Sequence, residues 1–171
     1  MIKSIDMNRN LFLLISIQTL FLVGNMMFVA LAPILGKELA GSMSLATLPI
    51  AVSMVTMLIF SFPLSIYMGR FGRGPVFTLG LIANLIAGLI FFAAVQLQLF
   101  SLFILGCIFF GFSIACANFY RFSAMELVDK DKQPLAISAV MAAGVVAALI
   151  GPNLSALTKD WGFEQAFFAS V

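Results

Sequence analysis

The stretch SIYMGRFGRGPVF, residues 65–77, places two arginines and three glycines between two long apolar runs. Charged residues make up only 9% of the chain, so Arg70 and Arg73 mark an unusual polar connection. Gly72, Gly74 and Pro75 are residue types that end one helix and begin the next within a few positions. The stretch therefore predicts a tight turn between two helices, and the flanking runs decide what those helices are.

The runs on both sides of the turn have the composition of a membrane protein. Hydrophobic residues make up 63% of the 171-residue chain and the mean hydropathy is +1.14. A soluble domain has roughly 45–50% apolar residues, and a spanning helix needs about 20 consecutive ones. Apolar blocks of that length are expected at residues 11–35, 45–68, 75–95, 100–120 and 135–157, and a sixth block begins near Phe163. The sequence predicts an all-α transmembrane protein with five helices and the start of a sixth.

The amino terminus and the cysteines fit this prediction. The first block is longer than the roughly 7–15 residues of a signal-peptide core, so it is expected to remain as a membrane anchor. Cys107 and Cys116 fall within one apolar block, where cysteine behaves as a small buried hydrophobe. No disulfide is expected.

Charge placement predicts the orientation in the membrane. With a cytoplasmic amino terminus, most basic residues fall in inner segments, as the positive-inside rule requires. The inner set is Lys3, Arg9, Arg70, Arg73, Arg121, Lys130 and Lys132. The outer set is Lys37 and Lys159. We expect a multi-pass protein of the plasma membrane, which in a bacterium is the inner membrane, in contact with the lipid bilayer.

The sequence lacks the residues that other classes of function require. The chain has no histidine, its acidic residues lie near the ends of the apolar blocks, and no metal-ligand spacing occurs. An enzyme is not expected, and neither is a metal or other cofactor. The net charge of +2 without a basic cluster offers no site for nucleic acid.

The turn at residues 70–73 resembles a signature of the major facilitator superfamily. Its loop between helices two and three carries a pattern close to G-x-L-A-D-R-x-G-R-K, and Arg70, Gly72 and Arg73 match the R-x-G-R part. Ser65 and Gly69 replace the first glycine and the acidic residue, which puts the family's acidic latch in doubt. An ordinary positively charged inner turn is the alternative.

A second resemblance lies in AAGVVAALIGPNLSAL, residues 142–157. Gly144, Ala147, Gly151 and Pro152 resemble the glycine-proline signature that this family carries on helix five, which is associated with exporters. Ser155 and Ala156 depart from it, so the resemblance favours export only weakly, and close helix packing is the alternative.

The resemblance extends over nearly the whole chain. The short connection at residues 96–98, the charged inner loop MELVDKDKQP and the stretch DWGFEQAFF at residues 160–168 all fit the amino-terminal half of the family fold. Such transporters combine two six-helix halves. Residues 1–171 then correspond to a partial amino-terminal bundle, with the carboxy-terminal half absent and supplied by the same transporter or by a second chain.

The resemblance implies a transporter that moves a small-molecule substrate by alternating access. The neutral apolar blocks, with 19 phenylalanines in the chain, favour a neutral or amphipathic compound. The alternative is a non-transporting receptor or assembly protein on the same scaffold. The proton-relay pattern R-x-x-Q-G of the fourth helix is absent, since Cys107 and Phe110 occupy its polar positions. Uniport, coupling through the other half, or coupling by other chemistry all remain open.

Polar residues within the blocks provide the candidate sites. Gln18 and Asn25 are seven apart and share a helix face, and Asn118 shares a face with Gly111 and Ala115. In the family the first and fourth helices line the central cavity, which implies substrate binding by Gln18, Asn25 and Asn118. Interhelical hydrogen bonding is the alternative for all three.

The remaining amide and the charges at the inner ends have other expected roles. Asn84, between Gly80 and Gly88, is expected to lie in a packing seam. The expected gating residues are Arg70, Gly72, Arg73, Arg121, Glu126, Gly151 and Pro152. For Arg121 and Glu126 the alternative is an ordinary anchor at the membrane interface.

Overall fold

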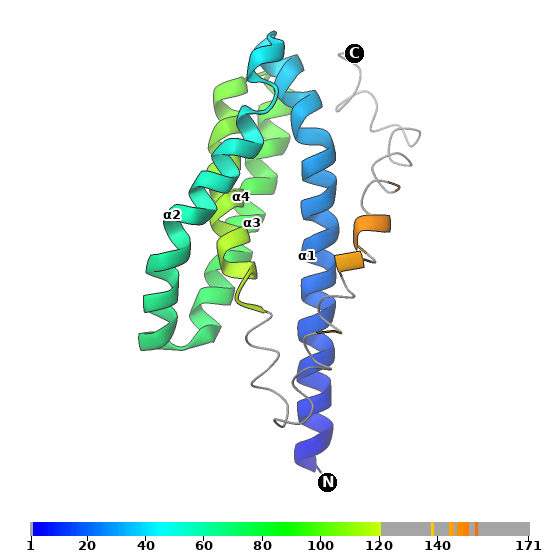
Figure 1. The fold of residues 1–171 in the computed structure, drawn as a ribbon, viewed down its shortest axis with the longest axis vertical. Coiled ribbons are helices and arrows are strands. Elements are labelled where there is room, and N and C mark those ends of the chain that lie inside the picture. Colours follow the sequence, from blue (N-terminus) through cyan, green and yellow to red (C-terminus); the bar gives the residue numbers. More distant parts are fainter. Residues whose placement is uncertain (1, 121–137, 139–143, 146, 151–152, 154–171) are drawn as a thin grey trace.

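The computed structural model describes residues 2–120 together with 138, 144–145, 147–150 and 153, and side chains from residue 16 onward. Its elements are α1 (Ile2–Ala40), the short 3₁₀ helix η1 (Met43–Leu45), α2 (Leu48–Phe71), α3 (Arg73–Gln96) and α4 (Phe100–Ala117). The helices run alternately up and down (Figure 1). No strand occurs within residues 2–120, and the predicted all-α fold is confirmed.

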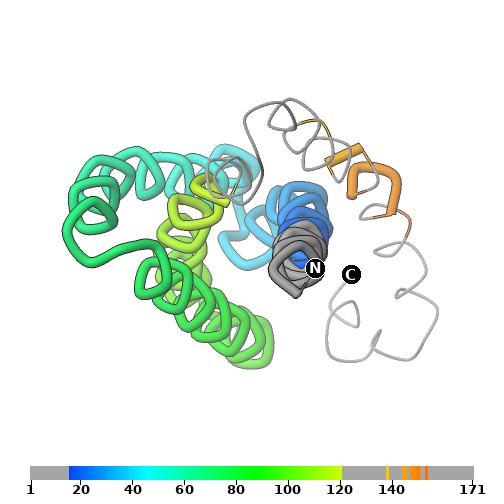
Figure 2. Tube along the Cα trace, turned by 90° about the horizontal axis from the view of Figure 1, so that it is seen from below, coloured from blue at the N-terminus to red at the C-terminus, as the bar shows by residue number. Residues whose placement is uncertain are grey.

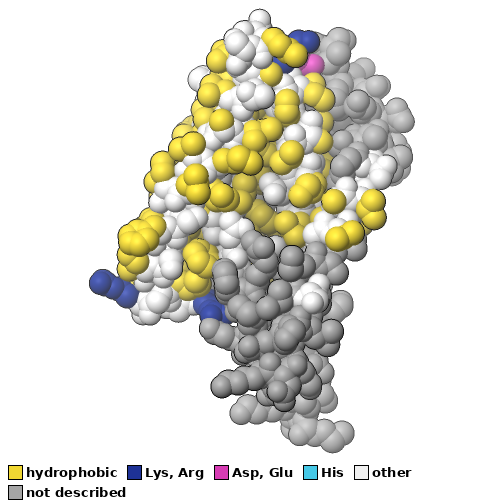
Figure 3. Space-filling model, viewed as in Figure 1, with side chains coloured by type: hydrophobic (Ala, Val, Ile, Leu, Met, Phe, Trp, Pro, Cys, Tyr) yellow, Lys and Arg dark blue, Asp and Glu magenta, His cyan; other side chains and the backbone are white. Residues whose placement is uncertain are grey.

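Four segments of the described part of the chain are long and apolar enough to cross a membrane: Ser16–Ala40, Met43–Phe71, Arg73–Gln96 and Phe100–Ala117. They correspond to the first four expected blocks. Exposed apolar side chains cover the visible face of the bundle, and Lys and Arg appear only near its ends (Figure 3). The expected fifth and sixth blocks lie largely or wholly outside the described residues.

Hydroxyl side chains inside the spans bond to their own helix. Ser53 Oγ donates to the Pro49 carbonyl over 2.9 Å, Ser61 Oγ donates to the Met57 carbonyl over 2.6 Å, and Thr78 donates to the Gly74 carbonyl. Back-bonding of this kind satisfies a hydroxyl where lipid offers no partner.

The turn between α2 and α3 consists of one residue, Gly72, with φ of +83°. Its N–H donates to the Met68 carbonyl over 3.0 Å, which closes α2, and α3 begins at Arg73. A positive φ is a conformation that glycine adopts at little cost. The short turn expected from the glycines is confirmed, and it forces α2 and α3 to lie antiparallel.

Helix α4 is the most buried of the four spans and packs closely on both α2 and α3. A Cβ atom built on Gly80 of α3 would lie 2.6 Å from Cβ of Cys116, and one on Gly111 would lie 2.8 Å from Cβ of Thr56. Small residues at these crossings let the helix backbones approach, as is usual in lipid. Cys107 and Cys116 are free and buried, as expected.

Helix α1 stands apart from this three-helix group, which Figures 1 and 2 show from two directions. The described residues between 144 and 150 lie on the other side of α1, and a Cβ atom on Gly144 would lie 3.8 Å from Leu22. Helix α1 is also the least buried of the four spans. Its wide separation from α3 and α4 leaves the space that forms the candidate site.

Candidate functional site

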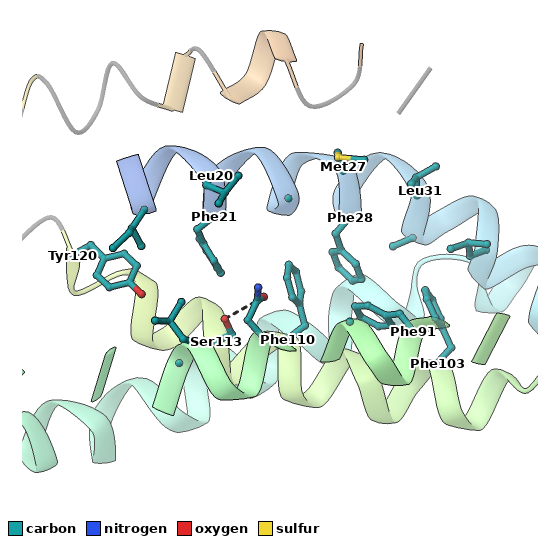
Figure 4. Close-up of a pocket in the computed structure, with 18 residues that line it drawn as sticks. Leu20, Phe21, Met27, Phe28, Leu31, Phe91, Phe103, Phe110, Ser113 and Tyr120 are labelled. Atoms are coloured by element: carbon teal, nitrogen blue, oxygen red, sulfur yellow. Dashed lines mark hydrogen bonds between the residues drawn. The ribbon is translucent and has the colours of Figure 1, made fainter. Parts of the chain in front are cut away.

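A cavity of about 450 Å³ lies between α1 and the α3–α4 pair. The α1 residues that line it recur every three or four positions along one face: Ile17, Leu20, Phe21, Gly24, Met27, Phe28, Leu31, Ala32 and Leu35. The opposite wall comes from α3 and α4, and Tyr120 closes one end (Figure 4). The volume lies within the range of about 300–1,000 Å³ typical of small-molecule sites.

Aromatic rings dominate the walls of the cavity. The Phe28 ring lies 4.5 Å from that of Phe110 and 5.5 Å from that of Phe91, measured between centroids. Phe21 stacks over Phe110 at 6.3 Å with an interplanar angle of 25°. Phe103 extends the cluster, with its ring 5.2 Å from that of Phe91. These rings join α1 to α3 and α4, and they point toward one another in Figure 4.

One polar pair interrupts the apolar wall. Ser113 Oγ of α4 donates a hydrogen bond to Asn84 Oδ1 of α3 over 3.4 Å, and both residues line the cavity (Figure 4). This distance exceeds the usual 2.5–3.0 Å of an O–H···O bond. The bond is therefore weak, and both groups can exchange it for a ligand at little cost.

The structure places Gln18 and Asn25 on a face of α1 beside the cavity, and neither residue lines it. At about 100° per residue, their shared face is rotated roughly a quarter turn from the lining stripe. Leu22, between them, is the α1 residue nearest to Gly144. The two amides therefore share a face, as predicted, and that face lies between the lining stripe and Leu22 around the helix.

Gln18 is 5% exposed, and its Oε1 atom has no hydrogen-bond partner among the described residues. An unsatisfied buried acceptor costs roughly 1–3 kcal/mol of stability. A ligand, a water molecule or another part of the protein that donates a hydrogen bond there would recover this energy.

Asn118 is directed toward α2 and is not among the residues that line the cavity. Its Nδ2 contacts Sδ of Met57 at 3.4 Å. The face that it shares with Gly111 and Ala115 is packed, since Gly111 meets Thr56 closely and Ala115 is fully buried. The structure therefore does not bring Gln18, Asn25 and Asn118 together in one space, and their role in substrate binding stays a prediction.

Asn84 was expected to lie in a packing seam, but it lines the cavity. Its neighbour Gly80 does pack tightly, on Cys116, but Gly88 has no atom within 4 Å of a built Cβ. Asn84 and Gly88 both line the cavity. Spacing along α3 identified a shared face, but it did not distinguish a packed part of that face from an open one.

The phenylalanines that line the cavity were not predicted from the sequence, although their spacing was a weak indication of them. Phe21 and Phe28 are seven apart on α1, and Phe103 and Phe110 are seven apart on α4. Such spacing places each pair on one helix face, yet in a chain with 19 phenylalanines it did not stand out.

Three of the predicted gating residues form the α2–α3 turn. Arg70 lies in the last turn of α2 and is exposed, Gly72 is the turn itself, and Arg73 begins α3. The remaining four, Arg121, Glu126, Gly151 and Pro152, lie outside the described residues.

Within the part of the chain that the structure describes, no group of three or more histidine, cysteine or acidic side chains could hold a metal ion. The walls of the cavity offer stacking, apolar contact, the Asn84–Ser113 pair and the side chain of Tyr120.

Comparison with known proteins supplies the family. The Major Facilitator Superfamily pattern matches residues 14–171. The chain is 32% identical over 161 residues to a protein of Brucella anthropi named Riboflavin transporter RfnT. The match covers 94% of this chain and 40% of that relative, so the chain spans less than half of the relative's length. No solved structure matches the chain. With four helices among its described residues that are long and apolar enough to cross a membrane, and a family match over most of its length, the chain belongs to the Major Facilitator Superfamily and is a transporter-family membrane protein.

Proposed function

We propose that the intact gene product carrying this chain moves a small organic solute across the plasma membrane by alternating access. The observation that carries the proposal is the family match over residues 14–171, together with the relative named as a transporter. The residues that line the cavity are mainly aromatic and aliphatic, and such walls can hold a solute. This supports transport over catalysis. The described bundle then belongs to an amino-terminal half that works against a carboxy-terminal half.

Riboflavin is the first solute to test, because it is the solute in the name of the relative. It is an uncharged molecule with a planar heteroaromatic ring and a polar side chain. This chemistry agrees with the neutral or amphipathic substrate expected from the sequence. Export as the direction of movement rests only on the helix-five signature of residues 144–152.

Gln18, Asn25 and Asn118 remain the proposed substrate contacts from the sequence analysis. The buried Oε1 of Gln18 supports that residue most strongly, since it is an acceptor that lacks a donor among the described residues. Asn118 is supported least, because its amide is already in contact with Met57.

The proposed gate is the α2–α3 turn with Arg70, Gly72 and Arg73, acting with Arg121, Glu126, Gly151 and Pro152. A one-residue turn couples the ends of two helices rigidly, so a contact made by either arginine is transmitted to both. The amino terminus and this turn lie toward the same end of the bundle, which we propose is cytoplasmic (Figure 1).

The test is riboflavin flux into vesicles that contain the purified intact gene product, measured with labelled riboflavin against protein-free vesicles. We expect saturable flux that unlabelled riboflavin suppresses. Saturable binding of riboflavin without flux would support a non-transporting receptor on the same scaffold and would refute the transport proposal.

A further inference from the structure

We infer that the cavity between α1 and the α3–α4 pair binds a planar heteroaromatic ring, with Asn84 and Ser113 hydrogen-bonding to a polar edge of that ring. The inference rests on the proposed transport function, because it names the substrate class and a site for it. That site is distinct from the face that carries Gln18 and Asn25.

The first argument is the shape of the walls. The stacked rings of Phe21 and Phe110 have centroids 6.3 Å apart. Carbon atoms in contact lie about 3.5–4.0 Å apart, so a flat ring inserted between two phenyl faces needs about 7 Å. The gap between the two ring faces is no wider than the distance between their centroids, so a stacked ligand ring requires the rings to separate by at least about 1 Å.

The second argument is that this widening is easy. Helix α1 is the least buried span and touches α3 and α4 far less than those two helices touch each other. Its contact with them runs through the ring cluster of Phe21, Phe28, Phe91, Phe103 and Phe110 and, nearer the end of α1, through Ala32 and Leu35. A ligand ring that stacks in the cluster replaces ring-to-ring contacts with similar ones, so little stabilisation is lost.

The third argument is open space on both sides of the rings. A Cβ atom on Gly24 of α1 or on Gly88 of α3 would meet no other atom within 4 Å, and both glycines line the cavity. The space therefore continues beyond the rings on each wall, as a ring with substituents requires.

The fourth argument is the polar pair. Asn84 presents two amide N–H groups and one carbonyl oxygen, and the only hydrogen bond found for its side chain within the described residues is the long one from Ser113. A ring edge with adjacent carbonyl and N–H groups pairs with a side-chain amide in two-point fashion, and such an edge occurs in the riboflavin ring. A purely aliphatic ligand would leave both polar groups unused.

Binding of labelled riboflavin to the purified intact gene product tests the inference, with two competing probes. Lumichrome carries the fused ring without the sugar-alcohol chain, and ribitol approximates the chain without the ring. We expect lumichrome to compete with a Kd within about tenfold of that of riboflavin and ribitol not to compete. Competition by ribitol alone would overturn the inference.

Two variants locate the site. In Gly24→Leu the new Cβ meets no atom within 4 Å and the rest of the side chain occupies the open space, so we expect the variant to abolish riboflavin binding while the protein melts as the unsubstituted protein does. Asn84→Ala should weaken the Kd about tenfold, as loss of a hydrogen-bonding partner does. Ala30→Leu is the matched control, since Ala30 is exposed on the opposite face of α1, and it should bind normally.

The outcomes separate the two proposals. Riboflavin flux with a KM that neither Gly24→Leu nor Asn84→Ala changes would leave transport standing and refute this cavity as the site. Binding that both variants weaken, without any flux, would support the site and refute transport.

Discussion

The hydroxyl of Ser113 donates a hydrogen bond to Oδ1 of Asn84 over 3.4 Å and so joins α4 to α3 at the wall of the cavity. The two residues are 29 positions apart, on antiparallel helices that the short connection after Gln96 brings together. Close packing of α4 also brings Gly80 of α3 against Cys116 and Gly111 of α4 against Thr56.

The crossing of α2 and α4 at Gly111 should not tolerate a side chain. In Gly111→Ala the new Cβ would meet the Ser53 carbonyl and would lie 2.8 Å from Cβ of Thr56. We expect the free energy of unfolding to fall by about 1–3 kcal/mol, as for overpacking in a filled core. Thermal melting in detergent measures the change. Gly88→Ala is the control, and because its Cβ meets nothing within 4 Å it should melt at the same temperature or higher.

The one-residue turn should require glycine at position 72. Gly72 has φ of +83°, where a Cβ atom costs roughly 1–2 kcal/mol. Gly72→Ala should therefore lower the melting temperature, whereas Gly74→Ala, at a glycine without positive φ and with open space around it, should not. Equal melting of both variants would show that the turn adopts another backbone conformation in the intact protein.

The two arginines of the turn should control transport more than insertion. Replacing Arg70 and Arg73 together with alanine removes the charges proposed to hold one conformation, and coupling of this kind typically changes an equilibrium about 5–150-fold. We expect riboflavin flux per inserted molecule to change by an amount in that range. Lys37→Ala, at the far end of α1, is the control. A double variant that only inserts poorly or inverts would identify the arginines as topological anchors.

Labelling should reveal the orientation. A cysteine placed at Gly74 should react only from the cytoplasmic side and one placed at Ser42 only from outside, because a single spanning helix, α2, separates the two positions. The native Cys107 and Cys116 are buried and should contribute little background. Reaction of both new cysteines from the same side would rule out α2 as a membrane span.

Gln18 can be tested through stability and transport together. In Gln18→Leu the unsatisfied Oε1 is removed, so the free energy of unfolding should rise by about 1 kcal/mol. If Gln18 accepts a hydrogen bond from the substrate, the same variant should raise the KM of flux. A higher melting temperature with an unchanged KM would assign Gln18 to structure alone.

The sequence by itself determined the class of this protein. Apolar runs of spanning length allow only a helix in lipid, because only a helix satisfies its backbone hydrogen bonds within one segment. Arg70, Gly72 and Arg73 also pointed to the family and located the sharpest turn, since a positive φ without a Cβ penalty is a local property of glycine. Local chemistry was sufficient for these conclusions.

Only the tertiary structure decided which amide lines the cavity. The sequence expected Asn118 there and Asn84 in a seam, yet Asn118 contacts Met57 and Asn84 lines the open space. Helical spacing shows which residues share a face, but the partner of that face depends on crossings between helices distant in sequence. Those crossings are set where a glycine meets a neighbour, as Gly80 meets Cys116 and Gly111 meets Thr56. The helix rotations that result direct Asn84 toward α1 and Asn118 toward α2.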